Sequence, residues 1–179
     1  ILALTLIIIN KIMGLFSFLK SAGAKLLGNK AAENDVKVEA PAPGAAMEAL
    51  KEAAEKNKAA ALVAQVVSHG IPVENLDIVV DDETATVYGQ VESTSLKEKV
   101  ILIVGNTEGI ASVDDRISVV NDEPEATFYT VQKGDSLSKI AKEQYGDMMK
   151  YPVIFEANKP MLTSPDLIYP GQVLRIPAL

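Results

Sequence analysis

The chain has 179 residues, and its composition excludes several kinds of functional site. It contains no cysteine, which rules out disulfides and thiolate metal sites. Its one histidine, His69, precedes Gly70 in a position typical of a helix end. A zinc site of the usual kind cannot be built, and a serine hydrolase would depend on that single imidazole. The composition therefore favours a binding protein over an enzyme.

The net charge of −7 is unevenly distributed. Residues 61–121 carry ten acidic and three basic side chains, whereas residues 128–179 carry five acidic and six basic ones. An acidic region repels nucleic-acid phosphates and attracts cations. We therefore expect no nucleic-acid partner, and we interpret most of these carboxylates as solvated surface.

The first nine residues form an apolar run that is shorter than the roughly twenty residues of a membrane-spanning helix. We expect Met13 to be the natural start and residues 1–12 to be an extension. The alternative is that residues 1–24 are an export signal, which would place the protein in the periplasm. Against it, no basic segment precedes the apolar run, and Lys20 lies close to the small residues of a cleavage site.

Residues 13–28 show apolar side chains at helical spacing with lysines off that stripe, which predicts a short amphipathic helix. We expect this helix to dock on the acidic region rather than to lie on a membrane surface. Residues 29–46 are rich in alanine, proline, glutamate and lysine, which is typical of a flexible linker.

A domain is predicted over residues 47–121, and its elements follow the order helix, strand, strand, helix, strand. At Gly70 the helical spacing of apolar residues ends, and apolar and polar residues alternate from there as in strands. Ser93 or Thr94 is expected to cap the second helix. The predicted elements are 47–68, 76–80, 84–91, 94–104 and 111–120. This order, with the glycine-containing turn at 105–115, resembles a BON domain. That family is associated with membranes and stress responses.

A second domain is predicted over residues 128–179, after a short linker at 122–127. Its predicted elements are a strand at 129–131, helices at 137–145 and 151–157, and a closing strand at 173–176. This pattern resembles a LysM domain, so the expected fold class is α+β with two small domains. In LysM domains a groove holds glycans that contain N-acetylglucosamine, as peptidoglycan does. The resemblance places that groove at Gly134, Asp135, Ser136, Leu137, Pro165, Asp166, Leu167 and Ile168.

The segment Gly134 to Leu137 also spells the sequence block that names a hydrolase family. We expect Asp135 or Ser136 to cap the following helix instead, because the backbone amides of a helix start need acceptors. No histidine follows to act as a base. We therefore predict no catalytic residue here.

The whole arrangement after Met13 is similar to a family of small bacterial potassium-binding proteins that join a BON and a LysM domain. The resemblance implies that K⁺ is the ligand and that the protein is cytoplasmic. Backbone carbonyls can replace the water shell of this cation, and the carbonyls at a helix C-terminus lack intrahelical partners. The segment 105–110 is such a terminus. The expected carbonyl ligands, on this resemblance, are those of Leu19, Ala22, Gly105, Thr107 and Ile110.

Two other functions stay open from the sequence. One is an exported envelope protein that binds peptidoglycan through the LysM groove and keeps its BON domain at the membrane. The other is a scaffold whose domains bind proteins. We expect a monomer whose flexible linker leaves room for compaction on ion binding.

Overall fold

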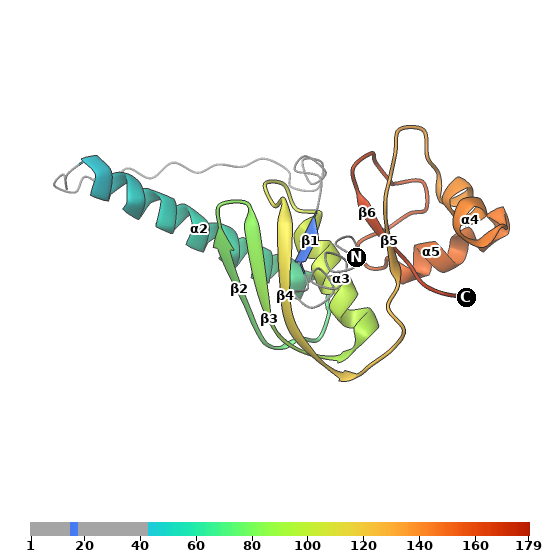
Figure 1. The fold of residues 1–179 in the computed structure, drawn as a ribbon, viewed down its shortest axis with the longest axis horizontal. Helices are drawn as coiled ribbons and strands as arrows, with labels where there is room; N and C mark the ends of the chain where they lie inside the picture. Colours follow the sequence, from blue (N-terminus) through green and yellow to red (C-terminus); the bar gives the residue numbers. More distant parts are fainter. Residues whose placement is uncertain (1–14, 18–42) are drawn as a thin grey trace, which may run out of the picture.

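The computed structural model describes residues 15–17 and 43–179 and contains two sheets (Figure 1). A four-stranded sheet has the order β1-β4-β3-β2, and a two-stranded sheet pairs β5 with β6. The architecture is α+β, as the sequence predicts. We call residues 43–121 the four-stranded unit and residues 127–179 the two-stranded unit.

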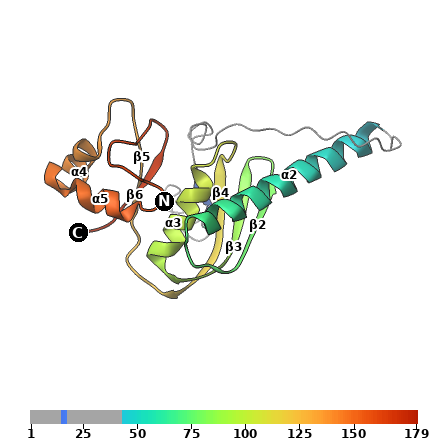
Figure 2. The ribbon, with the colours of Figure 1, turned by 180° about the vertical axis from the view of Figure 1, so that it is seen from behind.

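The four-stranded unit places two helices on one face of its sheet (Figure 2). Because β3 and β4 are parallel, the chain between them must cross over, and α3 makes that crossover. β2 and β3 form an antiparallel hairpin. The elements are α2 (Pro43–Ser68), β2 (Glu74–Asp81), β3 (Thr84–Ser93), α3 (Thr94–Gly105) and β4 (Ser112–Asn121).

The two-stranded unit packs two short helices against an antiparallel pair of strands. Its elements are β5 (Thr127–Thr130), α4 (Leu137–Tyr145), a 3₁₀ turn η2 (Met148–Lys150), α5 (Tyr151–Ala157) and β6 (Val173–Ile176). The Ser136 hydroxyl accepts a hydrogen bond from the Lys139 amide and so caps α4. Gly146 ends α4 in the left-handed conformation that glycine adopts at little cost.

The predicted helix over residues 13–28 is wrong at Leu15–Ser17, which form β1. This segment pairs antiparallel with β4, with Leu15 opposite Asp114. Without β1, the outer edge of β4 would expose a row of unpaired backbone groups. β1 pairs with the first three residues of that edge. The rest of the predicted helix, including Leu19 and Ala22, lies outside the described residues.

The predicted linker at 29–46 ends earlier than expected, because α2 begins at Pro43. Proline is well tolerated at the first helical position, where its missing N–H has no intrahelical partner to lose. The first turns of α2 extend beyond the sheet (Figure 1), and Met47 and Leu50 there are about 70% exposed. Packing therefore fixes only the C-terminal half of α2.

The core of the four-stranded unit lies between its helices and sheet. Leu62 and Val66 of α2 face a buried stretch of α3, Val100 to Val104, above the inward side chains of the strands. Burial of each such aliphatic side chain stabilises the fold by about 1.5–3 kcal/mol. Val173 of β6 belongs to this same core. Phe128 and Met161 of the two-stranded unit also pack against it, so the two units share an apolar contact region.

A buried ion pair fastens the units beside that contact. Arg175 Nε of β6 lies 2.5 Å from Glu98 Oε2 of α3, and both side chains are at most 9% exposed. The other oxygen of Glu98 accepts a hydrogen bond from the Ala126 amide at 2.8 Å. Glu123 also bonds to the start of α3 through its side chain and its amide. The predicted linker at 122–127 therefore runs along α3 and is bonded to it.

We predict that Glu98→Ala will lower the free energy of unfolding by about 3–5 kcal/mol, because it leaves the Arg175 guanidinium buried without its partner. Urea denaturation of the full chain measures this change. The matched control is Glu156→Ala, which removes an exposed carboxylate paired with Lys159 and should cost less than about 1 kcal/mol. Equal effects of the two substitutions would contradict this role of Glu98.

Candidate ion-binding loop and glycan groove

The loop Gly105–Ile110 begins at the C-terminus of α3. Gly105 is the last residue of the helix, so its carbonyl has no partner further along that helix. The Thr107 amide bonds to the Val104 carbonyl, and the Ile110 amide closes the turn on the Thr107 carbonyl at 3.2 Å. Gly109 has a φ of 80°, a left-handed conformation that favours glycine. The result is a tight turn at the negative end of the α3 dipole.

The three described residues of the predicted ion site lie together in this turn. Gly105, Thr107 and Ile110 are all buried. The Thr107 hydroxyl lies 2.9 Å from the Ile103 carbonyl and 3.0 Å from Gln65 Oε1, so it ties the turn to both α3 and α2. Leu19 and Ala22, the two other expected ligands, are outside the described residues. Of the other residues of the turn, Asn106 is buried, Gly109 is half-buried and Glu108 is exposed.

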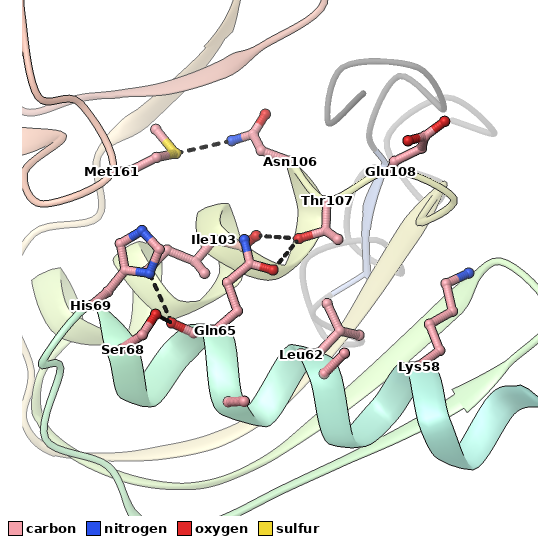
Figure 3. A pocket seen from close by; sticks show the side chains of 12 residues that line it. Lys58, Leu62, Gln65, Ser68, His69, Ile103, Asn106, Thr107, Glu108 and Met161 are labelled. Carbon is pink, nitrogen blue, oxygen red and sulfur yellow. Dashed lines mark hydrogen bonds between the residues drawn. The ribbon is translucent and has the colours of Figure 1, made fainter. Parts of the chain in front are cut away.

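A cavity of about 470 Å³ lies beside this turn, between α2, the end of α3 and Met161 (Figure 3). Figure 3 shows His69, Gln65 and Lys58 along α2, with Gln65 directed toward Thr107. His69 Nδ1 lies 2.8 Å from the Gln65 carbonyl, consistent with a helix-end residue. Lys58 Nζ donates to the Gly109 carbonyl at 2.6 Å. The loop therefore has a fixed positive charge as its neighbour.

Asn106 is a residue of this loop that sequence reasoning missed. Its side chain is 1% exposed and faces the two-stranded unit. Nδ2 donates to the Val173 carbonyl at 2.9 Å, and Oδ1 accepts from the Val173 amide at 2.8 Å. Nδ2 also lies 3.4 Å from the Met161 sulfur. The sequence does show an asparagine at the end of an apolar helix, which could have marked Asn106 as a buried polar residue. Its partner could not be identified in this way, because it lies 67 residues away.

The predicted glycan groove corresponds to a cavity of about 400 Å³ in the two-stranded unit. Asp135 is held in place there, since its Oδ2 accepts from the Tyr129 hydroxyl at 3.0 Å and from the Gln132 amide at 2.8 Å. Burial, together with the bond to Asp135, raises the pKa of Tyr129 to about 12. Residues that line the cavity are Asp135, Ser136, Leu137, Ser138, Tyr151, Pro165, Asp166 and Ile168.

Two predicted groove residues do not line that cavity. The Gly134 carbonyl accepts a hydrogen bond from Lys139 Nζ, and the Leu167 side chain is 62% exposed. The Leu137 side chain, which does line the groove, is otherwise part of the apolar core. Ser136 is engaged as a helix cap, and the one histidine of the chain lies in the other unit. The groove offers surfaces for contact rather than a nucleophile and base.

Comparisons with known proteins agree with this division. The BON domain model matches residues 56–121, and the LysM domain model matches residues 129–177. The potassium binding protein Kbp of Escherichia coli O6:H1 is 44% identical over 166 residues, which cover 92% of this chain and 99% of that protein. The chain belongs to the Kbp family. BON, LysM and Kbp are binding families rather than enzyme families.

A second relative is an uncharacterized protein of Deinococcus radiodurans, 59% identical over 51 residues. That match spans 28% of this chain and 19% of the other protein, so it concerns one domain only. The described helices of this Kbp-family chain include none that is long and apolar enough to cross a membrane.

We predict that Asn106→Ala will loosen the contact between the BON and LysM domains, because it leaves the Val173 amide and carbonyl buried without partners. Amide hydrogen exchange at Val173 should accelerate by about tenfold or more, since one lost bond costs about 1–3 kcal/mol. Asn121→Ala is the control, because Asn121 makes an exposed bond to Glu92. Unchanged exchange at Val173 in Asn106→Ala would show that Asn106 does not hold the contact.

Proposed function

We propose that this protein is a cytoplasmic potassium-ion-binding protein whose conformation responds to the ion. The observation that carries the proposal is the turn at Gly105–Ile110, which follows a helix C-terminus and in which Gly105, Thr107 and Ile110 are buried. The name of its Kbp relative, a potassium binding protein, supports the same ligand. K⁺ needs no cluster of charged ligands, because carbonyl oxygens can replace its hydration shell.

The carbonyls of Gly105, Thr107 and Ile110 would provide part of the shell, and those of Leu19 and Ala22 would complete it. The turn is joined to both domains, through Thr107 to α2 and through Asn106 to β6. An ion that binds one arrangement of these contacts better than another shifts the population toward it. A sensor requires this difference in affinity and no further chemistry. We expect the protein to act as a monomer.

In a first test, KCl and NaCl are titrated into the protein at constant ionic strength while amide NMR signals are followed. We expect signals of residues 105–110 to shift with K⁺ and to respond much less to Na⁺. An equal response to both salts, or no response, would refute the selective site.

Gly109→Ala gives the same proposal a mutational test. A left-handed φ at a non-glycine residue costs about 1–3 kcal/mol, so the variant should distort the turn and weaken K⁺ binding by about tenfold. Gly70→Ala is the matched control, because Gly70 also follows a helix with φ of 69° but lies outside the turn. Similar K⁺ affinities of the two variants would argue against a site in this turn.

A second candidate function is glycan binding, favoured by the groove between Asp135–Ser138 and Pro165–Ile168. We expect a tetramer of N-acetylglucosamine to bind there, and Asp166→Ala to weaken binding by about fivefold through loss of a hydrogen-bond acceptor. Glu143→Ala is the control, since Glu143 is exposed on α4 outside the groove. Isothermal titration calorimetry measures the affinity of the wild-type chain and of the two variants for the tetramer. Absence of binding by the wild-type chain at millimolar tetramer would eliminate this candidate.

A further inference from the structure

A lysine ammonium group is held against the candidate ion-binding turn. Lys58 reaches from α2, and its Nζ donates to the Gly109 carbonyl at 2.6 Å and lies 3.4 Å from the Asp82 carbonyl. Gly109 stands between Thr107 and Ile110, two of the expected ligand residues. A monovalent cationic group therefore already lies on one backbone oxygen of the turn that would receive a monovalent ion.

The nearby carboxylates of Asp82 and Glu55 are engaged with groups other than Lys58. Asp82 is paired with Lys51 at 3.0 Å, and Glu55 accepts from the Asp82 amide while lying 3.5 Å from Lys51. Across residues 15–17 and 43–179, no carboxylate is found within 4.0 Å of Lys58 Nζ. Lys58 and Gly109 are half-buried, and Ile110 is buried, so solvent screens this charge incompletely.

We propose that Lys58 sets the ion affinity of the turn, acting as a fixed positive charge that weakens cation binding at Gly105–Ile110. The inference rests on the proposed potassium function and adds a named determinant of its affinity. Repulsion between two unit charges depends on their separation and not on which monovalent cation is bound. Lys58 therefore lowers the affinities for different monovalent cations together and leaves the ratio between them unchanged.

The hydrogen bond and the charge of Lys58 have opposite effects on cation affinity. The direction in which affinity changes in a neutral variant therefore distinguishes the two effects. Loss of the bond to the Gly109 carbonyl frees the turn, and a less ordered turn binds more weakly. Loss of the charge removes repulsion and strengthens binding. A tighter-binding neutral variant is therefore explained by electrostatics and not by a structural role of the side chain.

The test is calorimetric titration of the full chain and its variants with K⁺ and separately with Rb⁺, at constant ionic strength held by choline chloride. Lys58→Met should bind both cations about three- to tenfold more tightly with an unchanged ratio. The gain should shrink as choline chloride is raised, because salt screens the charge. Lys58→Gln is a second neutral variant, in case methionine at this half-buried position disturbs the fold.

Two variants serve as controls. Lys58→Arg keeps the charge and the donor, and its affinity should stay within about twofold of wild type. Lys56→Met removes the same charge from the same helix, at an exposed lysine paired with Glu52, and should also have no effect. If the wild-type chain binds K⁺ but both neutral variants bind it equally or more weakly, this inference alone is overturned. If the wild-type chain binds no K⁺, the proposed function fails as well.

Discussion

The hydrogen-bonded pairing of the Asn106 amide with the Val173 peptide group is the contact on which the arrangement of this protein depends. It lies at the end of α3, between the helix and the turn that follows it. There the side chain of Asn106 joins the BON domain to β6 of the LysM domain. A primary amide satisfies one peptide N–H and one peptide C=O at once, so it mimics a neighbouring strand. An ionised carboxylate could not do both, because it has no proton to donate, and a hydroxyl would have to make both bonds through a single oxygen.

The pairing also solves a problem of the LysM sheet. A sheet of two strands leaves an edge on each, and the unpaired groups of a buried edge are costly. Asn106 covers β6 at Val173, and Asn158 makes the same two bonds to Arg175, each at 2.8 Å. One asparagine comes from each domain. The free edge of β6 is therefore completed by side chains, half of them supplied by the BON domain.

Local patterns predicted most of the secondary structure. Both LysM helices begin and end at the predicted residues. For α4 the reason is local, because a serine cap, an apolar stripe and a glycine stop all lie within a few positions of one another, and α5 has a proline in its first turn. Prediction failed where the partner is distant in sequence. Residues 15–17 pair with a strand about a hundred residues away, and Asn106 and Glu98 find partners 67 and 77 residues away. No periodicity encodes such contacts, and the residue types alone do not name their partners.

Under the proposed potassium function, the domain contact would give the LysM domain a role that does not require glycan. A weakly hydrated cation is held best by oxygens that have already lost competing water, because reorganising them on binding costs free energy. β6 and Met161 cover one side of α3's C-terminal turn, and α2 covers another through Gln65 and Lys58. These contacts cover two sides of the turn, and a cavity lies beside it. Under the proposed function, ion affinity would depend on how firmly the LysM domain is seated, and the buried pair of Glu98 and Arg175 would contribute to it without touching the ion.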